Sequence, residues 1–182
     1  MTQLLLRLLI STYSGIMEFA RFASLVLLRF TPLWEQWDIA ARAAVPLARK
    51  GGASKPAVWI HAASLGECKL LVRFLAILRS RHPGREYVLT ATTRTGVEYL
   101  RRCEGSDIIA AAFLPFDTMR LMLSLLSTYS ISRVWLMETE LWPAMLLACR
   151  EKRVPVGLAN ARIEEDSLSW YLLFSEPPPT VS

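Results

Sequence analysis

Cysteine and histidine are scarce in this 182-residue sequence. The three cysteines, Cys68, Cys103 and Cys149, are far apart and form no C-x-x-C pair. An odd, scattered set of cysteines argues against a disulfide scaffold and is typical of a reducing compartment. The two histidines, His61 and His82, are too few for a histidine-rich metal site.

Common motifs for binding phosphate or for nucleophilic catalysis are also missing. No G-x-G-x-x-G follows the first predicted strand, and there is no Walker A sequence. The segment "AASLGE" at 62–67 lacks the G-x-S-x-G of a nucleophile elbow, which argues against Ser64 as a nucleophile. Aromatic residues are not interleaved with a basic patch, so we expect no nucleic acid partner.

Long uncharged runs are absent from the apolar first thirty residues. The longest, Leu8 to Met17, is about half of the ~20 residues that a spanning helix needs. The segment is therefore an interfacial helix, a charge-interrupted anchor, or a helix buried against the domain. We expect membrane association, and the net charge of +5 favours anionic partners in general.

From residue 56 onward, short apolar strands alternate with amphipathic helices. The predicted strands cover 57–62, 86–92, 107–115, 133–139 and 154–160, and the predicted helices cover 67–82, 95–103, 117–129 and 141–153. This alternation predicts right-handed βαβ units and an α/β fold, with a parallel sheet flanked by helices. Nearly continuous apolar strands fit a sheet that is buried on both faces.

Polar residues gather directly after the predicted strands, which is where open parallel sheets bind ligands. The candidate binding and catalytic residues at these positions are Ser64, Gly66, Glu67, Thr93, Arg94, Thr95, Glu138, Glu140, Asn160 and Arg162. The small residues at 62–66 are expected to allow a tight turn and the close approach of a ligand.

The carboxylates have both structural and functional interpretations. Glu67 either complements the dipole of the helix that it begins or acts as a general base. Glu138 ends a buried strand, so it needs an ion-pair partner such as Arg94 or Arg162, or it belongs to an active site. Glu140 is expected to cap the next helix. The hydroxyls of "TATTRTG" at 90–96 either cap a helix or bind sugar hydroxyls or an anion.

Five motifs in this order resemble one family. They are "WIHAASLGE" at 59–67, "TATTRTG" at 90–96, "LPFD" at 114–117, "METELWPA" at 137–144 and "PVGLANARI" at 155–163. Together they resemble the N-terminal half of bacterial 3-deoxy-D-manno-octulosonic acid (Kdo) transferases, over roughly residues 56 to 170.

The resemblance implies a GT-B glycosyltransferase of lipopolysaccharide synthesis that moves Kdo from CMP-Kdo to a lipid A precursor, lipid IVA. It implies inversion, no metal and no cofactor, with Glu67 as general base and Glu138 stabilising the transition state. The acceptor-binding residues would then be Ser64, Gly66, Thr93, Arg94, Thr95, Glu140, Asn160 and Arg162. The implied location is the cytoplasmic face of the cell inner membrane.

The expected organisation has four segments. Residues 1–30 form an apolar membrane-associated helix, 31–55 a helix and linker, 56–174 a Rossmann-like acceptor-binding domain, and 175–182 a disordered tail. We expect the donor-binding domain to be absent from this chain. The alternative function is therefore a non-catalytic, membrane-associated module that binds lipid A precursors or a partner protein.

Overall fold

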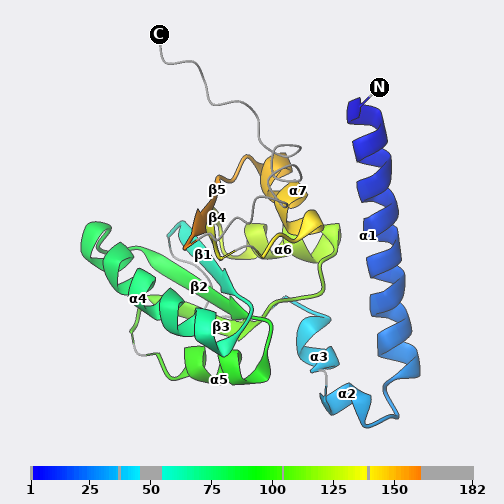
Figure 1. The fold of residues 1–182 in the computed structure, drawn as a ribbon, viewed down its shortest axis with the longest axis horizontal. Coiled ribbons are helices and arrows are strands. Elements are labelled where there is room, and N and C mark those ends of the chain that lie inside the picture. The colour runs from blue at the N-terminus through cyan, green and yellow to red at the C-terminus, as the bar shows by residue number, and fades with distance from the viewer. Residues whose placement is uncertain (1, 37, 46–54, 104, 139, 161–182) are drawn as a thin grey trace.

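A five-stranded parallel sheet forms the centre of the computed structural model, which describes residues 2–36, 38–45, 55–103, 105–138 and 140–160 (Figure 1). The strand order is β3-β2-β1-β4-β5. The strands are β1 (Ala57–Ala62), β2 (Glu86–Ala91), β3 (Ile108–Phe113), β4 (Ile131–Met137) and β5 (Val156–Ala159). The predicted α/β class and the predicted parallel sheet are confirmed.

Helices cover both faces of the sheet. One face packs against α4 (Leu65–Arg81) and α5 (Arg94–Arg101), and the other packs against α6 (Met119–Thr128) and α7 (Pro143–Lys152) (Figure 1). Successive strand residues serve opposite cores: Trp59 packs on the side of α6 and α7, whereas Ile60 packs on the side of α4 and α5. Both are fully buried, as expected for a strand covered on both faces.

The predicted boundaries of β3, β4 and β5 differ from the observed ones by one or two residues at each end. Strand β5 spans four residues instead of the seven predicted, because it is an edge strand with β4 as its one neighbour, and the pairing ends where Met137 meets Ala159. Strand β4 begins two residues earlier than predicted, since Ile131 already pairs with Ala57 of β1.

The chain begins with a long helix, α1 (Thr2–Leu27), followed by the short helices α2 (Leu33–Gln36) and α3 (Ile39–Arg42). Helix α1 contacts the domain through polar groups. The hydroxyl of Tyr13 donates to Asp117 Oδ2 at 2.9 Å, and Arg120 donates to Glu18 at 3.3 Å. Within the described residues, no helix has the length and apolar character needed to cross a membrane. Membrane association therefore stays a prediction.

Some predictions lie outside the described residues. They include Arg162, the last part of the expected 56–174 domain, the expected tail at 175–182, and residues 46–54 of the expected helix and linker at 31–55.

Candidate functional site

The strand order reverses between β1 and β4, the two neighbours from which the sheet grows in opposite directions. In open parallel sheets, ligands bind beyond the carboxyl ends of the strands at such a switch point. Here the segment after β1 carries Glu67, and the segment after β4 carries Glu138 and Glu140. The fold thus brings together carboxylates that are about 70 residues apart in the sequence.

Glu67 is held by the first turn of α4. Its Oε2 accepts from the backbone N–H of Ala63 at 2.8 Å, and its Oε1 accepts from the hydroxyl of Ser64 at 3.0 Å. Ser64 is the N-cap, and its Oγ accepts from the N–H of Glu67 at 3.3 Å. This is a form of the S-x-x-E capping box, a signal that the sequence contains and that would have predicted the contact. Each carboxylate oxygen retains lone pairs for a further partner, so a structural role and a catalytic one are compatible.

Gly66, one of the small residues at 62–66, is not itself required sterically for the turn. Its φ is not positive, and a Cβ at this position would meet only Ser64 Oγ, at an ordinary 3.7 Å. The turn into α4 is made through the N-cap Ser64, and a side chain at position 66 would fit without a clash. The exposed surface at Gly66 stays a predicted contact for a ligand.

Glu138 has a strained backbone. Its φ is 57°, in the left-handed region, and its N–H donates to Ala159 O at 2.9 Å. Such a conformation costs ~1–3 kcal/mol for a residue other than glycine and often accompanies functional sites. No side-chain partner of Glu138 occurs among the described residues. Of the two ion-pair partners considered, Arg94 pairs instead with Asp38 at 2.8 Å and also donates to Glu35 O, and Arg162 lies outside the described residues.

Glu140 lies among negative charges. Burial raises the pKa of Glu140, and the charge of Glu67 adds to this effect; the Trp142 indole opposes it, and Glu138 adds further. The predicted cap by Glu140 is wrong, since the N-cap position of α7 is Trp142, which makes no side-chain cap bond. Glu140 instead belongs to a cluster of three carboxylate side chains, which are those of Glu67, Glu138 and Glu140.

Asp117 performs the capping that was expected of Glu140. Its Oδ2 accepts from Ala144 N at 3.0 Å and its Oδ1 from Met145 N at 2.9 Å, and Tyr13 donates to Oδ2. The side chain is 1% exposed, and burial raises its pKa although the three hydrogen bonds act in the opposite direction. The sequence placed Asp117 after a strand, but no local pattern indicates that it caps a helix 26 residues later.

The hydroxyl-rich segment mainly caps a helix. Thr93 is the N-cap of α5 and accepts from Gly96 N at 3.2 Å, whereas Thr95 is exposed. Gly96 permits close packing, because a Cβ there would lie 3.0 Å from Cys68 Sγ. Asn160 directly follows β5, has a φ of 57° and is exposed.

A buried polar cluster that sequence analysis missed lies beneath the site. Thr90 Oγ1 accepts from Trp59 Nε1 at 2.8 Å and lies 2.9 Å from His61 Nδ1. Burial lowers the pKa of His61 to about 3, so its imidazole is neutral. His61 Nε2 is buried without a hydrogen-bond partner among the described residues, and the His61 ring meets the Trp142 ring edge to face at 6.3 Å.

A pocket of about 590 Å³ opens beside these residues, between the sheet edge and helices α1 and α3. It combines apolar walls with charged groups, as ligand pockets commonly do. Its lining residues are Met17, Ala20, Ser24, Asp38, Ile39, Arg42, Thr92, Thr93, Arg94, Leu114, Pro115, Phe116, Asp117 and Trp142.

The raised pKa of Glu140 leads to a stability prediction. In the window from its ordinary value of 4.5 up to the raised value, the folded protein holds this proton more tightly than the unfolded chain. Stability is therefore lost as the pH rises through that window. We expect Glu140→Gln to raise Tm at pH 7.5 by more than at pH 4. Thermal unfolding at both pH values checks this, with the exposed Glu98→Gln as control; an equal shift at both would contradict it.

Comparisons with known proteins agree on one family. The family profile described as 3-deoxy-D-manno-octulosonic-acid transferase (kdotransferase) matches residues 37–177. A 3-deoxy-D-manno-octulosonic acid transferase of Bordetella pertussis is 35% identical over 142 residues, which cover 73% of this chain and 32% of the relative. The protein of the same name from Haemophilus influenzae is 30% identical over 124 residues, covering 66% of this chain and 29% of the relative. The chain thus spans about a third of the length of these relatives.

Proposed function

Because the chain belongs to the 3-deoxy-D-manno-octulosonic acid (Kdo) transferase family, we propose that it forms the acceptor-binding half of a glycosyltransferase. The transferred sugar is Kdo, the donor is CMP-Kdo, and the acceptor is the lipid A precursor lipid IVA. The chain spans about a third of the length of these relatives, so transfer itself is proposed for an enzyme that includes a donor-binding half.

This proposal rests mainly on the cluster of three carboxylate side chains at the switch point between β1 and β4. Glu67, fixed by Ala63 N and Ser64 Oγ, is the general base that takes the proton from an acceptor hydroxyl. The hydroxyl oxygen then bonds to the anomeric carbon of Kdo as the bond to CMP breaks, and the configuration inverts. Positive charge that develops on the sugar ring is stabilised by Glu138, while Glu140, whose pKa is raised, hydrogen-bonds an acceptor hydroxyl.

The acceptor has an amphipathic character that suits the neighbouring pocket. Arg94, with a side chain that is 53% exposed, provides a cation at the rim for an acceptor phosphate. The apolar walls from α1, α3 and the loop after β3 suit acyl chains. Ser64, Gly66, Thr93, Thr95 and Asn160 contribute hydrogen bonds or close backbone contacts, and Arg162 is assigned to this role from its sequence motif alone.

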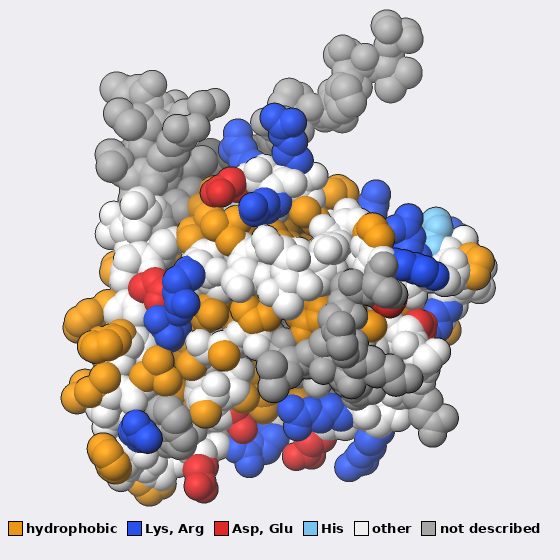
Figure 2. All heavy atoms as spheres, turned by 180° about the vertical axis from the view of Figure 1, so that it is seen from behind, with side chains coloured by type: hydrophobic (Ala, Val, Ile, Leu, Met, Phe, Trp, Pro, Cys, Tyr) orange, Lys and Arg blue, Asp and Glu red, His pale blue; other side chains and the backbone are white. Residues whose placement is uncertain are grey.

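Helix α1 supports a location at the cytoplasmic face of the inner membrane. Large apolar side chains gather over α1, at the left edge of Figure 2. Phe19 and Phe22 of α1 are 72% and 61% exposed, and Phe30, just after the helix, is 90% exposed. A helix with such an apolar surface and interspersed arginines suits the interface of a bilayer, with its axis along the membrane plane.

Binding of lipid IVA to the chain in detergent tests the acceptor site. We expect saturable binding, which Arg94→Ala weakens about tenfold because a charge-assisted contact to phosphate is lost. Glu138→Ala is expected to weaken binding less, since its main role is in the transition state. The matched control is Arg102→Ala, an exposed arginine at the end of α5 that lies outside the pocket.

Two outcomes would count against the proposal. If Arg94→Ala and Arg102→Ala weaken binding equally, the acceptor does not bind in this pocket. No saturable binding by a chain with a folded circular dichroism spectrum would remove the acceptor-binding role altogether. Saturable binding without transfer, even with a donor-binding half present, would favour the alternative of a non-catalytic lipid-binding module.

A further inference from the structure

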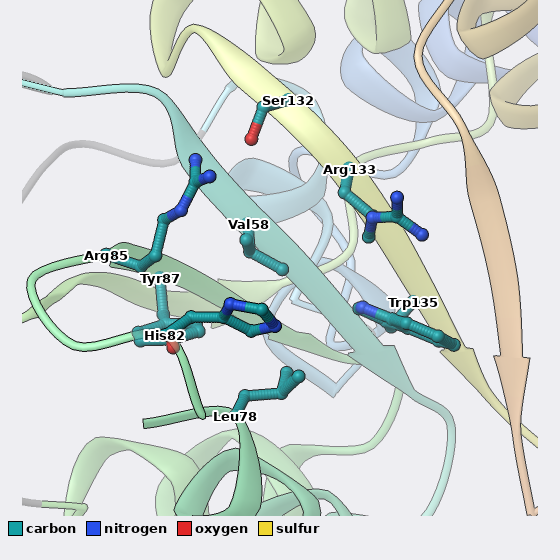
Figure 3. Close-up of a pocket in the computed structure, with 8 residues that line it drawn as sticks. All are labelled: Val58, Leu78, His82, Arg85, Tyr87, Ser132, Arg133 and Trp135. Carbon is teal, nitrogen blue, oxygen red and sulfur yellow. The ribbon is translucent and has the colours of Figure 1, made fainter. Parts of the chain in front are cut away.

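A second pocket, of about 410 Å³, lies at the opposite edge of the sheet, where β1, β2 and β4 begin. Figure 3 shows its lining side chains, which come from these strands, from the end of α4 and from the loop after it. Neither the carboxylates at the switch point nor the first pocket contributes to it. Its volume is within the range of small-molecule sites.

The charged groups of this pocket are all basic. Arg85 and Arg133 are exposed arginines on different segments, and His82, beside Tyr87, also lines the pocket (Figure 3). No carboxylate pairs with Arg85 or Arg133 within the described part of the chain, whereas nearby Asp107 is already bound by Arg79 through two contacts of 2.6 and 2.7 Å. The pocket therefore presents positive charge without a neutralising partner.

Tyr87 supplies an unused hydrogen-bond group. The residue is 1% exposed, and its hydroxyl is buried with no hydrogen-bond partner among the described residues. Buried polar groups are nearly always hydrogen-bonded, so an orphaned hydroxyl in a pocket wall calls for a missing partner. Burial raises the pKa of Tyr87, Asp107 adds to this, and Arg79 and Arg85 oppose it, so the phenol keeps its proton and is a neutral O–H donor.

The remaining wall is apolar and firmly packed. The Arg133 guanidinium lies 5.7 Å from the centre of the Trp135 ring, and Phe74 meets Trp135 edge to face at 5.1 Å. Gly157 on β5 is required for this arrangement, since a Cβ there would lie 2.4 Å from the Trp135 ring. Arg133 is thus held over a fixed aromatic wall instead of moving freely in solvent.

We propose that this pocket binds a phosphomonoester with a small apolar or aromatic body. Arg85 and Arg133 bind the phosphate oxygens, the hydroxyl of Tyr87 donates a further hydrogen bond, and the body packs on Val58 and Trp135. Arginine suits such anions because its guanidinium offers several donors in one plane. This inference is independent of the proposed function, because it uses other residues at the other edge of the sheet.

Titration with phenyl phosphate, followed by saturation-transfer NMR on the full chain in detergent, tests the site. We expect a Kd on the order of 0.1–1 mM, with inorganic phosphate binding more weakly and phenol showing no saturable binding. Arg85→Ser and Arg133→Ser are each expected to raise the Kd about tenfold, and Tyr87→Phe about fivefold. All three variants leave the circular dichroism spectrum unchanged, since two positions are exposed and the third loses only a hydroxyl.

Arg81→Ser is the matched control, because Arg81 is an exposed arginine at the end of α4 that does not line the pocket. It is expected to leave the Kd unchanged within twofold. Equal losses for Arg81→Ser and Arg133→Ser would show diffuse charge attraction and overturn the site, as would the absence of saturable binding. Dibutyryl phosphatidic acid identifies the source: tighter binding than phenyl phosphate indicates a lipid headgroup, and weaker binding indicates a soluble metabolite.

Discussion

Replacing Glu67 by glutamine is expected to reduce Kdo transfer by about 10²–10⁴-fold, the usual contribution of a general base. Glutamine has nearly the same shape and still accepts one hydrogen bond from Ala63 N or Ser64 Oγ, and it occurs naturally in capping boxes. The fold and acceptor binding should therefore be retained while the base is lost. The measurement is transfer from CMP-Kdo to lipid IVA, with the donor-binding half of a relative fused to the chain, together with lipid IVA binding.

The variant Ser64→Ala separates the structural role of this turn from its catalytic role. Removing the N-cap hydroxyl is expected to lower stability by about 1 kcal/mol. It leaves the carboxylate in place through Ala63 N, so transfer should fall much less than in Glu67→Gln. If Glu67→Gln instead loses stability but keeps its turnover, Glu67 caps α4 and is not the general base. The exposed Glu98→Gln controls for a general effect of removing one negative charge.

The sheet could be predicted from the sequence because burial on both faces leaves a simple pattern. Strand β1 is apolar from Ala57 to Ile60, and the prediction for it matches at both ends. The ends of β3, β4 and β5 differ from the predicted ones by one or two residues, because pairing with neighbouring strands sets these ends and cannot be read from a single strand. The site could be predicted in outline for a related reason: parallel strands bring their carboxyl ends to one edge, so Glu67 and Glu138 had to be close.

The contacts within the site could not be predicted, since they depend on tertiary packing. The sequence offered Arg94 as a partner for Glu138. In the fold, Arg94 instead pairs with Asp38, the N-cap residue of α3, which is 56 residues away in the sequence. His61 has the sequence context of an ordinary strand residue. Its contact is Thr90 Oγ1, which also accepts from Trp59 Nε1, and this arrangement is visible only in the folded sheet. In contrast, the S-x-x-E box at Ser64 and Glu67 is a local signal and was available from the sequence.

Asp117→Ala is expected to have the largest effect on stability, about 3 kcal/mol, and to lower Tm by about 6–12 °C for a chain of this size. The change leaves the N–H groups of Ala144 and Met145 buried without an acceptor and removes the partner of Tyr13. Loss of a helix cap alone costs ~0.5–2 kcal/mol, and unsatisfied buried donors add to this. Denaturant unfolding of the chain in detergent measures the difference.

Two comparisons divide the stability lost in Asp117→Ala between the contact with α1 and the cap of α7. Tyr13→Phe removes only the contact between α1 and Asp117, so it should cost about 1 kcal/mol and leave α7 capped. Asp107→Ala removes a carboxylate of the same type from a partly exposed ion pair with Arg79, and it should cost ~1 kcal/mol or less. If Asp117→Ala costs no more than Asp107→Ala, then Asp117 does not hold α7. If Tyr13→Phe alone reproduces the full loss, the stability comes from docking α1 against the domain, because the two N–H groups of α7 keep their acceptor in that variant.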